Sequence, residues 1–343
     1  MQTLHKRIRA FTDLGLILAD AASPDPSSSE AVRLRRVMDN QQQKNKWFTP
    51  DNVIRSVKAI ANMLREDKLL EWLGKYNIAD EPPFKKTIAV IMAGNIPLVG
   101  FHDFLCVLIS GNNLLAHTSS KDSELIRVIS EMLIALNYSF SDKISLSGKI
   151  SPPYDAVIAT GSNNTSRYFE YYFGDKPHIF RKNRNSIAII DRQTDEKSVR
   201  NLALDIFTYF GLGCRNVSKI YFEDGTGPDK IISHLSDWQH IIQHRPYANN
   251  YVYNKSLFNL NKQAFLDSGF MLFKKDSALA SPVSVTYYDF FSKRDELLKE
   301  LGRQAGMIQC IVSENDLPFG LTQYPGPGEY ADNVDTLAFL TSL

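Results

Sequence analysis

Cys214 is the residue of this 343-residue chain whose neighbours best fit a reactive nucleophile. It lies between Gly213 and Arg215, after an apolar run at 202–210 and before an alternating run at 217–222. A thiol attacks as the thiolate, and a guanidinium together with the backbone N–H groups of a glycine-containing loop favours that form. A small hydrophobic residue that falls in a loop is the alternative interpretation. The neighbours favour a nucleophile.

Two other segments, at 93–97 and 160–165, carry polar groups suited to anions. In the first, the side-chain amide of Asn95 could donate to a developing oxyanion, although a turn or cap residue is an equally good interpretation. In the second, Thr160, Gly161 and Ser162 open an expected helix, whose N-terminal N–H groups and dipole attract phosphate. Neither segment is a complete Gly-x-Gly-x-x-Gly fingerprint.

The elements that must position these residues begin with a helical region at 1–84, which we expect to pack on the first domain. Apolar residues at helical spacing predict a helix over 4–21, and the Pro- and Ser-rich stretch at 23–29 predicts a loop. Thr49 is the expected N-cap of a second helix, with Pro50 at its first position.

From Lys86 onward, strands and helices alternate. The continuous apolar run at 87–92 is typical of a strand buried on both faces of a parallel sheet. The α/β rhythm predicts two doubly wound domains that bind ligands at the carboxyl ends of their strands. The first spans 85–197, with 323–343 as a candidate addition, and the second spans 198–322 and carries Cys214. We expect strands at 87–92, 113–116, 143–146, 155–160, 187–190, 219–222, 270–273, 283–288 and 307–312, and helices at 96–109, 123–136 and 162–173.

Composition excludes several classes of function. The formal net charge is +1 with interspersed signs, which gives no basis for binding nucleic acid. The longest apolar run, at 96–109, is interrupted by His102 and Asp103, so we expect no membrane span. No secretory signal is recognisable, and we expect a cytoplasmic protein with reduced thiols. Cys106 and Cys310 fall in apolar segments, where we expect inert core thiols.

Taken together, the motifs resemble those of the aldehyde dehydrogenase superfamily, and within it the LuxC-type acyl-CoA reductases. The superfamily likeness rests on 94–97, 111–120, 160–162 and 214–221, in this order. The narrower likeness rests on 47–49, 211–219 and 330–336. The resemblance covers most of the chain from Trp47 and implies an aldehyde-dehydrogenase-like fold, although the chain is shorter than a typical aldehyde dehydrogenase.

The resemblance implies that Cys214 takes the acyl group of a coenzyme A thioester as an enzyme thioester, and that hydride then releases an aldehyde. Asn95 would form the oxyanion hole with the backbone N–H of Cys214, a type of contribution worth roughly 3 kcal/mol in other enzymes. The implied contacts of the nicotinamide dinucleotide are Gly94, His117, Ser119, Ser120, Thr160, Gly161 and Ser162. The resemblance makes 85–197 the dinucleotide-binding domain and 198–322 the catalytic domain. It also implies dimers or larger assemblies and allows an acyl-transferring protein as partner.

Three departures from the superfamily pattern refine this expectation. His117 replaces a common lysine, which alters the ribose contact. Ser120 replaces the acidic residue that selects a free ribose hydroxyl, which favours NADPH over NADH. The segment at 180–185 lacks the carboxylate that activates water in oxidising members, as expected for a thioester reductase. The basic residues of that segment either meet cofactor phosphates or form a solvated loop.

Competing interpretations remain open from the sequence. A non-redox acyl-transfer or acyl-carrying protein would use Cys214 without hydride transfer, and a degenerate subunit of the same fold is a third possibility. His240 and His244 share a helical spacing, but no third ligand is evident, so we expect no metal site. Leu212 replaces a glutamine frequent in the family, and the sequence offers no reason for it.

Overall fold

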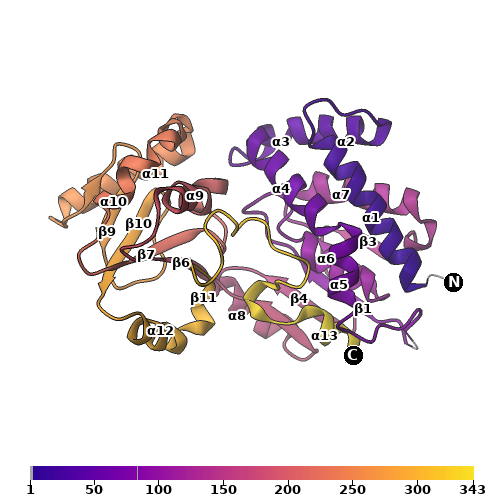
Figure 1. Ribbon diagram of the computed structural model, residues 1–343. Helices are drawn as coiled ribbons and strands as arrows, with labels where there is room; N and C mark the ends of the chain where they lie inside the picture. The colour runs from indigo at the N-terminus through magenta and orange to yellow at the C-terminus, as the bar shows by residue number, and fades with distance from the viewer. Residues whose placement is uncertain (1–2, 83) are drawn as a thin grey trace. The chain divides into compact units, whose positions relative to one another are not determined.

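The structure is a computed structural model that describes residues 3–82 and 84–343, in two compact units (Figure 1). The first unit comprises residues 1–182 and 324–343, and the second comprises 183–323. The chain therefore passes between the units twice. The sequence analysis placed the domain boundary after 197, whereas the division between the compact units follows Lys182.

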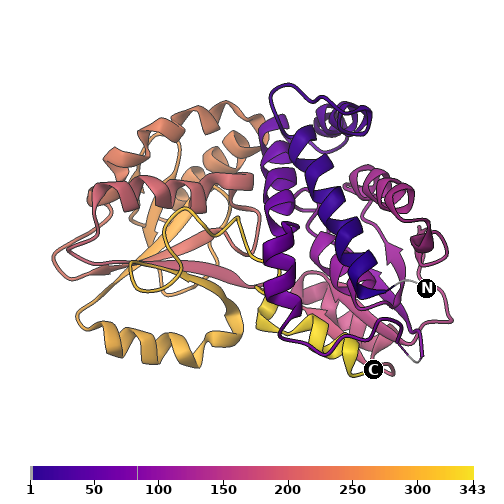
Figure 2. The same cartoon turned by 45° about the vertical axis from the view of Figure 1, so that its right-hand side comes forward.

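The first unit begins with helices, as the sequence predicts. They are α1 (Leu4–Ala21), α2 (Ser29–Asp39), α3 (Gln41–Lys44), α4 (Pro50–Met63) and α5 (Glu66–Leu73). The Thr49 hydroxyl caps α4 by accepting the N–H of Asn52, and Pro50 opens the helix. Helices α1 and α4 lie side by side (Figure 2), and the apolar residues of both are buried in one core.

The sheet of the first unit is wholly parallel and has the strand order β3-β2-β1-β4-β5. Its strands are β1 (Thr87–Ile91), β2 (Asn113–His117), β3 (Ile144–Ser147), β4 (Ala156–Thr160) and β5 (His178–Arg181). The main connecting helices are α6 (Phe101–Ile109), α7 (Ser123–Leu136) and α8 (Asn163–Phe173). Strand β1 is central, and β2 and β4 flank it.

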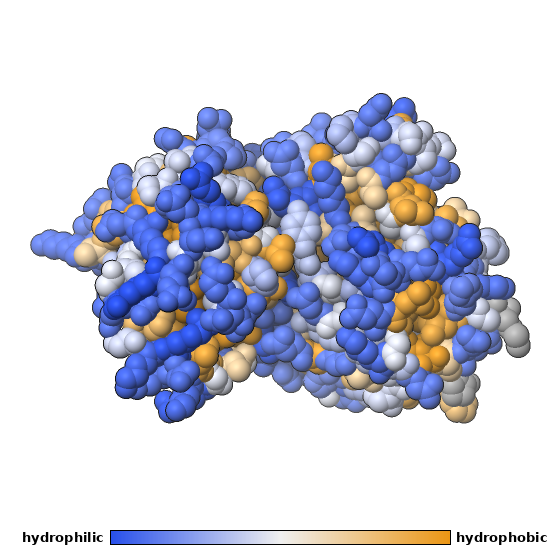
Figure 3. All heavy atoms as spheres, in the orientation of Figure 1, coloured by the Kyte–Doolittle hydropathy of each residue, from blue (hydrophilic) through white to orange (hydrophobic). Residues whose placement is uncertain are grey.

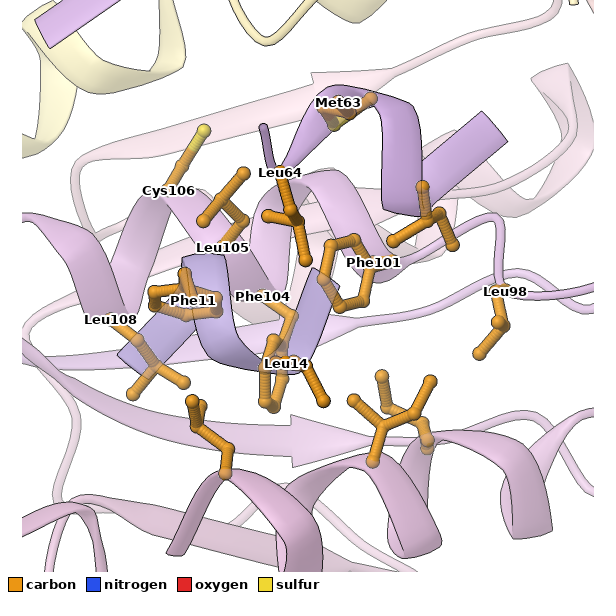
Figure 4. Packing of buried hydrophobic residues seen from close by; sticks show 14 of the residues in the cluster. Phe11, Leu14, Met63, Leu64, Leu98, Phe101, Phe104, Leu105, Cys106 and Leu108 are labelled. Carbon is orange, nitrogen blue, oxygen red and sulfur yellow. The ribbon is translucent and has the colours of Figure 1, made fainter. Parts of the chain in front are cut away.

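The core of the first unit joins the N-terminal helices to this sheet. Figure 4 shows Phe11 and Leu14 of α1 among Phe101, Phe104 and neighbouring residues of α6. The rings of Phe11 and Phe104 meet edge to face at a centroid distance of 6.5 Å. The helical region at the N-terminus thus shares the core of the first unit.

The C-terminal segment completes the first unit. Helix α13 (Thr336–Thr341) contacts α6, and Leu337 and Leu340 are buried in the same core. Upstream of α13, the Tyr330 hydroxyl accepts the Trp72 indole N–H at 2.8 Å. Burial next to Tyr76 raises the pKa of Tyr330 far above its ordinary value. The segment is therefore held to α5 and α6 by both apolar and polar contacts.

The sheet of the second unit has the order β11-β6-β7-β10-β9-β8 and is parallel except for the pair β8 and β9. Its strands are β6 (Asn185–Ile190), β7 (Val217–Glu223), β8 (Leu266–Asp267), β9 (Leu272–Lys275), β10 (Val285–Phe291) and β11 (Ile308–Val312). Helices α9 (Glu196–Phe207), α10 (Asp229–Ile232) and α11 (Arg245–Leu260) lie on one face, and α12 (Arg294–Arg303) lies on the other (Figure 1).

Two sequence-based assignments need correction. The strand expected at 187–190 in the first sheet is β6 of the second sheet, where it pairs with β7 and β11. The strand in that place in the first sheet is β5, for which the sequence analysis expected no strand. Its last two residues belong to the basic segment at 180–185. The helix expected from Ile96 begins at Phe101, because 95–100 form a turn with Leu98 in the left-handed region.

Hydrophilic residues cover most of the face shown in Figure 3, and apolar residues form smaller separate areas on it. Within residues 3–82 and 84–343, no helix combines the length and the apolar character that crossing a membrane requires.

Candidate active site

The first unit gathers all of the predicted cofactor residues and Asn95 at one edge of its sheet. His117 ends β2 and is paired in register with Ile91, the last residue of β1, which leads to Gly94 and Asn95. Thr160 ends β4, on the other side of β1. Carboxyl ends of parallel strands meet at one edge, and ligands of doubly wound sheets bind there.

Gly94 and Ser119 lie in direct contact at this edge. A Cβ atom at position 94 would clash with the Ser119 side chain, so only glycine fits without a shift. Ser119 also accepts the N–H of Lys121 through its hydroxyl. Asn95 and Ser120 are both exposed.

The turn after β4 is built around the N-terminus of α8. Ser162 is the N-cap of α8, and its hydroxyl accepts the N–H of Thr165 at 3.2 Å. A Cβ atom at Gly161 would lie 2.9 Å from the Phe169 ring. Packing therefore explains the glycine and capping explains the serine, while the backbone of both residues stays at the carboxyl edge.

One buried polar atom at this edge has no hydrogen-bond partner among the described residues. His117 Nδ1 is buried and makes no hydrogen bond within the described part of the chain. A buried polar atom of this kind is costly unless a water molecule or a ligand satisfies it. His117 therefore fits a polar ligand at the end of β2.

Arg181 is neither a phosphate ligand nor part of a solvated loop. It is 3% exposed, and its guanidinium pairs with the Asp103 carboxylate, with Nη2 and Oδ1 at 2.6 Å. It also donates to the Ala331 carbonyl at 2.7 Å and to the Thr336 hydroxyl at 2.8 Å. Arg181 thus fastens the C-terminal segment to the sheet.

The second unit presents Cys214 in a loop between α9 and β7, where the thiol residue is half-buried. Buried Asn216 shapes this loop. Its Oδ1 accepts the Gly213 N–H at 2.9 Å, and its Nδ2 donates to the carbonyls of Thr208 at 2.8 Å and Asp205 at 3.0 Å. The last carbonyls of a helix lack intrahelical partners, and this amide satisfies those at the end of α9.

Arg215 is tied to the same unit by a second chain of hydrogen bonds. Its Nε donates to the Thr322 carbonyl at 2.6 Å. Thr322 in turn donates its N–H and hydroxyl to the buried Asp205 carboxylate, which also accepts the Gly320 N–H at 2.6 Å. Burial raises the pKa of Asp205, and these hydrogen bonds oppose the rise. The carboxylate thereby fixes the backbone that holds Arg215.

Left-handed backbone precedes the cysteine. Tyr209, Phe210 and Gly211 have φ values of 54°, 59° and 76°, and the first two are unusual for residues with side chains. Such strain clusters at functional sites. The Phe210 ring stacks on His244 at a centroid distance of 4.1 Å. Gly213 has no positive φ, so its N–H bond to Asn216, and not glycine freedom, sets the loop there.

The sequence analysis also considered two further cysteines and a pair of histidines. Cys106 is fully buried, and burial raises the pKa of its thiol well above the ordinary value. Cys310 is also buried, in β11. The His240 ring contacts the Asp237 carbonyl at 2.9 Å. The described residues contain no group of three or more His, Cys, Asp or Glu side chains that could hold a metal ion.

Sequence reasoning gave no structural role to Asn216, Asp205 or Asp122. Asn216 stands two residues after Cys214, a position that could have drawn attention to it. Neither aspartate carries a local sequence signal, because the partner of each lies far away in the chain. Asp122 accepts the N–H of Leu98, and Asp205 accepts the N–H of Gly320.

Comparison with known proteins places this geometry in context. Residues 33–271 match the family model for acyl-CoA reductase (LuxC). The long-chain acyl-protein thioester reductase of Aliivibrio fischeri is 24% identical over 224 residues, which cover 60% of this chain and 46% of that protein. The chain thus spans about half the length of the curated relatives it matches.

Solved structures share the fold at low sequence identity. An acetylating aldehyde dehydrogenase from Geobacillus thermoglucosidasius aligns with a TM-score of 0.64 and 9% identity, covering 99% of this chain and 90% of that one. The indole-3-acetaldehyde dehydrogenase AldA of P. syringae, solved with NAD+, aligns with a TM-score of 0.59 and 14% identity, covering 86% and 69%. Because the family match spans most of the chain, the protein belongs to the LuxC acyl-CoA reductase family and has the aldehyde dehydrogenase fold.

Proposed function

We propose that this protein reduces an acyl thioester to an aldehyde, with Cys214 as the nucleophile and NADPH as the reductant. The observation that carries the proposal is the loop of Cys214, which a dedicated buried amide, Asn216, shapes in a chain of the LuxC family. The A. fischeri relative is named for acting on long-chain acyl-protein thioesters. An acyl group on coenzyme A or on a carrier protein is therefore the proposed substrate.

In this mechanism the Cys214 thiolate attacks the acyl carbon, the carbon–sulfur bond to coenzyme A breaks, and the leaving thiolate takes up a proton. The acyl group is then held as a thioester on Cys214. Asn95 and the backbone N–H of Cys214 donate hydrogen bonds to the oxyanion in the proposed hole. Addition of a hydride to this thioester carbon would give a tetrahedral oxyanion bound to the Cys214 sulfur. Its collapse breaks the carbon–sulfur bond, so the aldehyde is released and Cys214 returns to the thiolate.

The bound reduced nicotinamide supplies the hydride that converts the thioester carbon to the aldehyde level. The carboxyl edge of the first sheet fits such a ligand, because His117 has a buried ring nitrogen that lacks a partner in the described chain. Gly94, Ser119, Ser120, Thr160, Gly161 and Ser162 are the other proposed contacts. Exposed Ser120 in place of an acidic residue favours NADPH, and NADH is the alternative.

The experiment measures the loss of NADPH absorbance after a long-chain acyl-CoA is added to the full chain, together with the intact mass of the protein. We expect nucleotide consumption, and a Cys214 acyl adduct when NADPH is omitted. Cys214→Ala removes both, while Cys310→Ala, a matched change of a buried thiol, preserves both. NADH in place of NADPH tests the cofactor preference.

Each other outcome has a definite meaning. An adduct without nucleotide consumption would support an acyl-transfer or acyl-carrying protein in place of a reductase. Full activity of Cys214→Ala would refute the nucleophile. Asn95→Ala is expected to lower kcat by roughly 10²- to 10³-fold, the range for removal of one oxyanion donor.

A further inference from the structure

The loop that carries Asn95 runs from Gly94 to Leu98 and is held from several sides. The Asn45 side chain contacts the Gly94 carbonyl at 3.5 Å, and the Ser56 hydroxyl donates to the Pro97 carbonyl at 2.7 Å. The connection between β2 and α7 reaches the same loop at both ends, with Ser119 against Gly94 and Asp122 against Leu98.

The contact between Asp122 and Leu98 is the shortest of these hydrogen bonds. The Asp122 Oδ2 accepts the Leu98 N–H at 2.6 Å in a buried environment. Leu98 has a φ of 58°, an unfavourable left-handed conformation for a residue with a side chain. Its side chain is 4% exposed and belongs to the cluster in Figure 4. The backbone at this point is therefore fixed on its amide side by Asp122 and on its side-chain side by the core.

Asp122 occupies a position that normally serves another purpose. It is the N-cap residue of α7, where an aspartate usually accepts an N–H of its own helix. Here its side chain makes no capping hydrogen bond and is directed to Leu98 instead. Asp122 therefore bonds the loop that carries Asn95 and leaves the N-terminus of α7 without a side-chain cap.

The surroundings of Asp122 suit a neutral acid. The residue is 6% exposed, and its second oxygen, Oδ1, makes no hydrogen bond within residues 3–82 and 84–343. Burial raises its pKa to about 8, and the Leu98 N–H opposes the rise. A neutral side chain of the same shape, such as asparagine, can therefore replace it as an acceptor.

We propose that Asp122 is a positioning residue, which fixes the loop bearing Asn95 through its hydrogen bond to Leu98. The catalytic consequence rests on the proposed function, because Asn95 is an oxyanion donor only in that reaction. Removal of the acceptor leaves the buried Leu98 N–H unsatisfied and lets the loop open. A donor that acts in the transition state then loses its place, so kcat falls and KM stays near its original value.

The test compares Asp122→Leu with Asp122→Asn in the full chain. Leucine has the shape of aspartate and suits a buried site, so the variant is expected to fold, yet it offers no acceptor. Asparagine restores the acceptor. The control is Asp155→Leu, which removes the carboxylate that accepts the Thr87 N–H at 2.7 Å, at the opposite end of β1.

Two readouts separate the positioning role from the proposed function. Hydrogen exchange of the Leu98 amide is expected to accelerate about tenfold or more in Asp122→Leu and to stay near wild type in Asp122→Asn and in the control. The kcat for acyl-CoA reduction is expected to fall about tenfold in Asp122→Leu alone, with KM for acyl-CoA unchanged.

Wild-type exchange at Leu98 in Asp122→Leu would overturn the proposal whatever the activity. Faster exchange with an unchanged kcat would also overturn it, because the loop would then not govern Asn95. A wild-type protein that does not reduce acyl-CoA would refute the proposed function, while the exchange measurement would still decide whether Asp122 fixes the loop.

Discussion

Replacing Asn216 by alanine is the most direct test of how the loop that carries Cys214 is held. The change removes one acceptor and two donors at once. The Gly213 N–H loses its partner at 2.9 Å, and the carbonyls of Thr208 and Asp205 lose theirs at 2.8 and 3.0 Å. Since Asn216 is 3% exposed, water cannot readily replace the amide.

These contacts set the size of the effect. Each lost hydrogen bond contributes about 1 kcal/mol on average, and more where the remaining group stays buried. Three such bonds give an expected loss of about 3 kcal/mol in the free energy of unfolding of the second unit. The loop that carries Cys214 is released by the same change, so the rate of Cys214 alkylation should change as well.

The assay is urea denaturation together with the rate of iodoacetamide modification of Cys214. Asn250→Ala is the control, because its amide donates to a single carbonyl, that of Pro246, at 2.8 Å on α11. We expect that control to lose about 1 kcal/mol and to keep the alkylation rate. A loss below about 1 kcal/mol in Asn216→Ala with an unchanged alkylation rate would refute the role given to Asn216.

Three further outcomes are expected. The pKa of Asp122 in the folded state lies above its unfolded value, so between these two values only the folded state keeps the proton. The free energy of unfolding should therefore fall as pH rises from about 4 to 8, by up to about 1.4 kcal/mol per pH unit. Urea denaturation over a pH series should show this slope in the wild type and not in Asp122→Asn. Arg181→Met should lower the free energy of unfolding by about 3–5 kcal/mol, because it leaves the Asp103 charge buried without its partner. The double variant Arg181→Met with Asp103→Leu should lose less, and equal losses of the two variants in urea denaturation would contradict this. Ser162→Ala should lower stability by about 1 kcal/mol through loss of the α8 cap on Thr165, and an unchanged melting temperature would show that the cap contributes nothing.

The sequence alone determined the local elements and their class. Helical spacing at 4–21, the Thr49 cap before Pro50, and the continuous apolar run at 87–92 each correspond to an element of the structure. These signals succeed because capping and periodic burial depend on residues close together in the chain. The ordered motifs around Asn95 and Cys214 also identified the family before any contact was known.

Tertiary structure alone decided which sheet a strand joins and what a buried polar group does. β6 has the apolar pattern of any central strand, and only its pairing with β7 and β11 assigns it to the second sheet. Arg181 lies in a basic segment that looks like a solvated loop in the sequence. Only its buried ion pair with Asp103, 78 residues away, shows that it is a structural residue.

The same distinction holds at the candidate active site. The type of residue identified Cys214 as the candidate nucleophile, but the sequence could not indicate that Asn216 shapes its loop or that Asp122 turns from its own helix to Leu98. Those choices depend on which backbone groups are left unsatisfied once the sheets and helices have packed. Which buried backbone groups still need a hydrogen-bond partner is decided only by the packed tertiary structure.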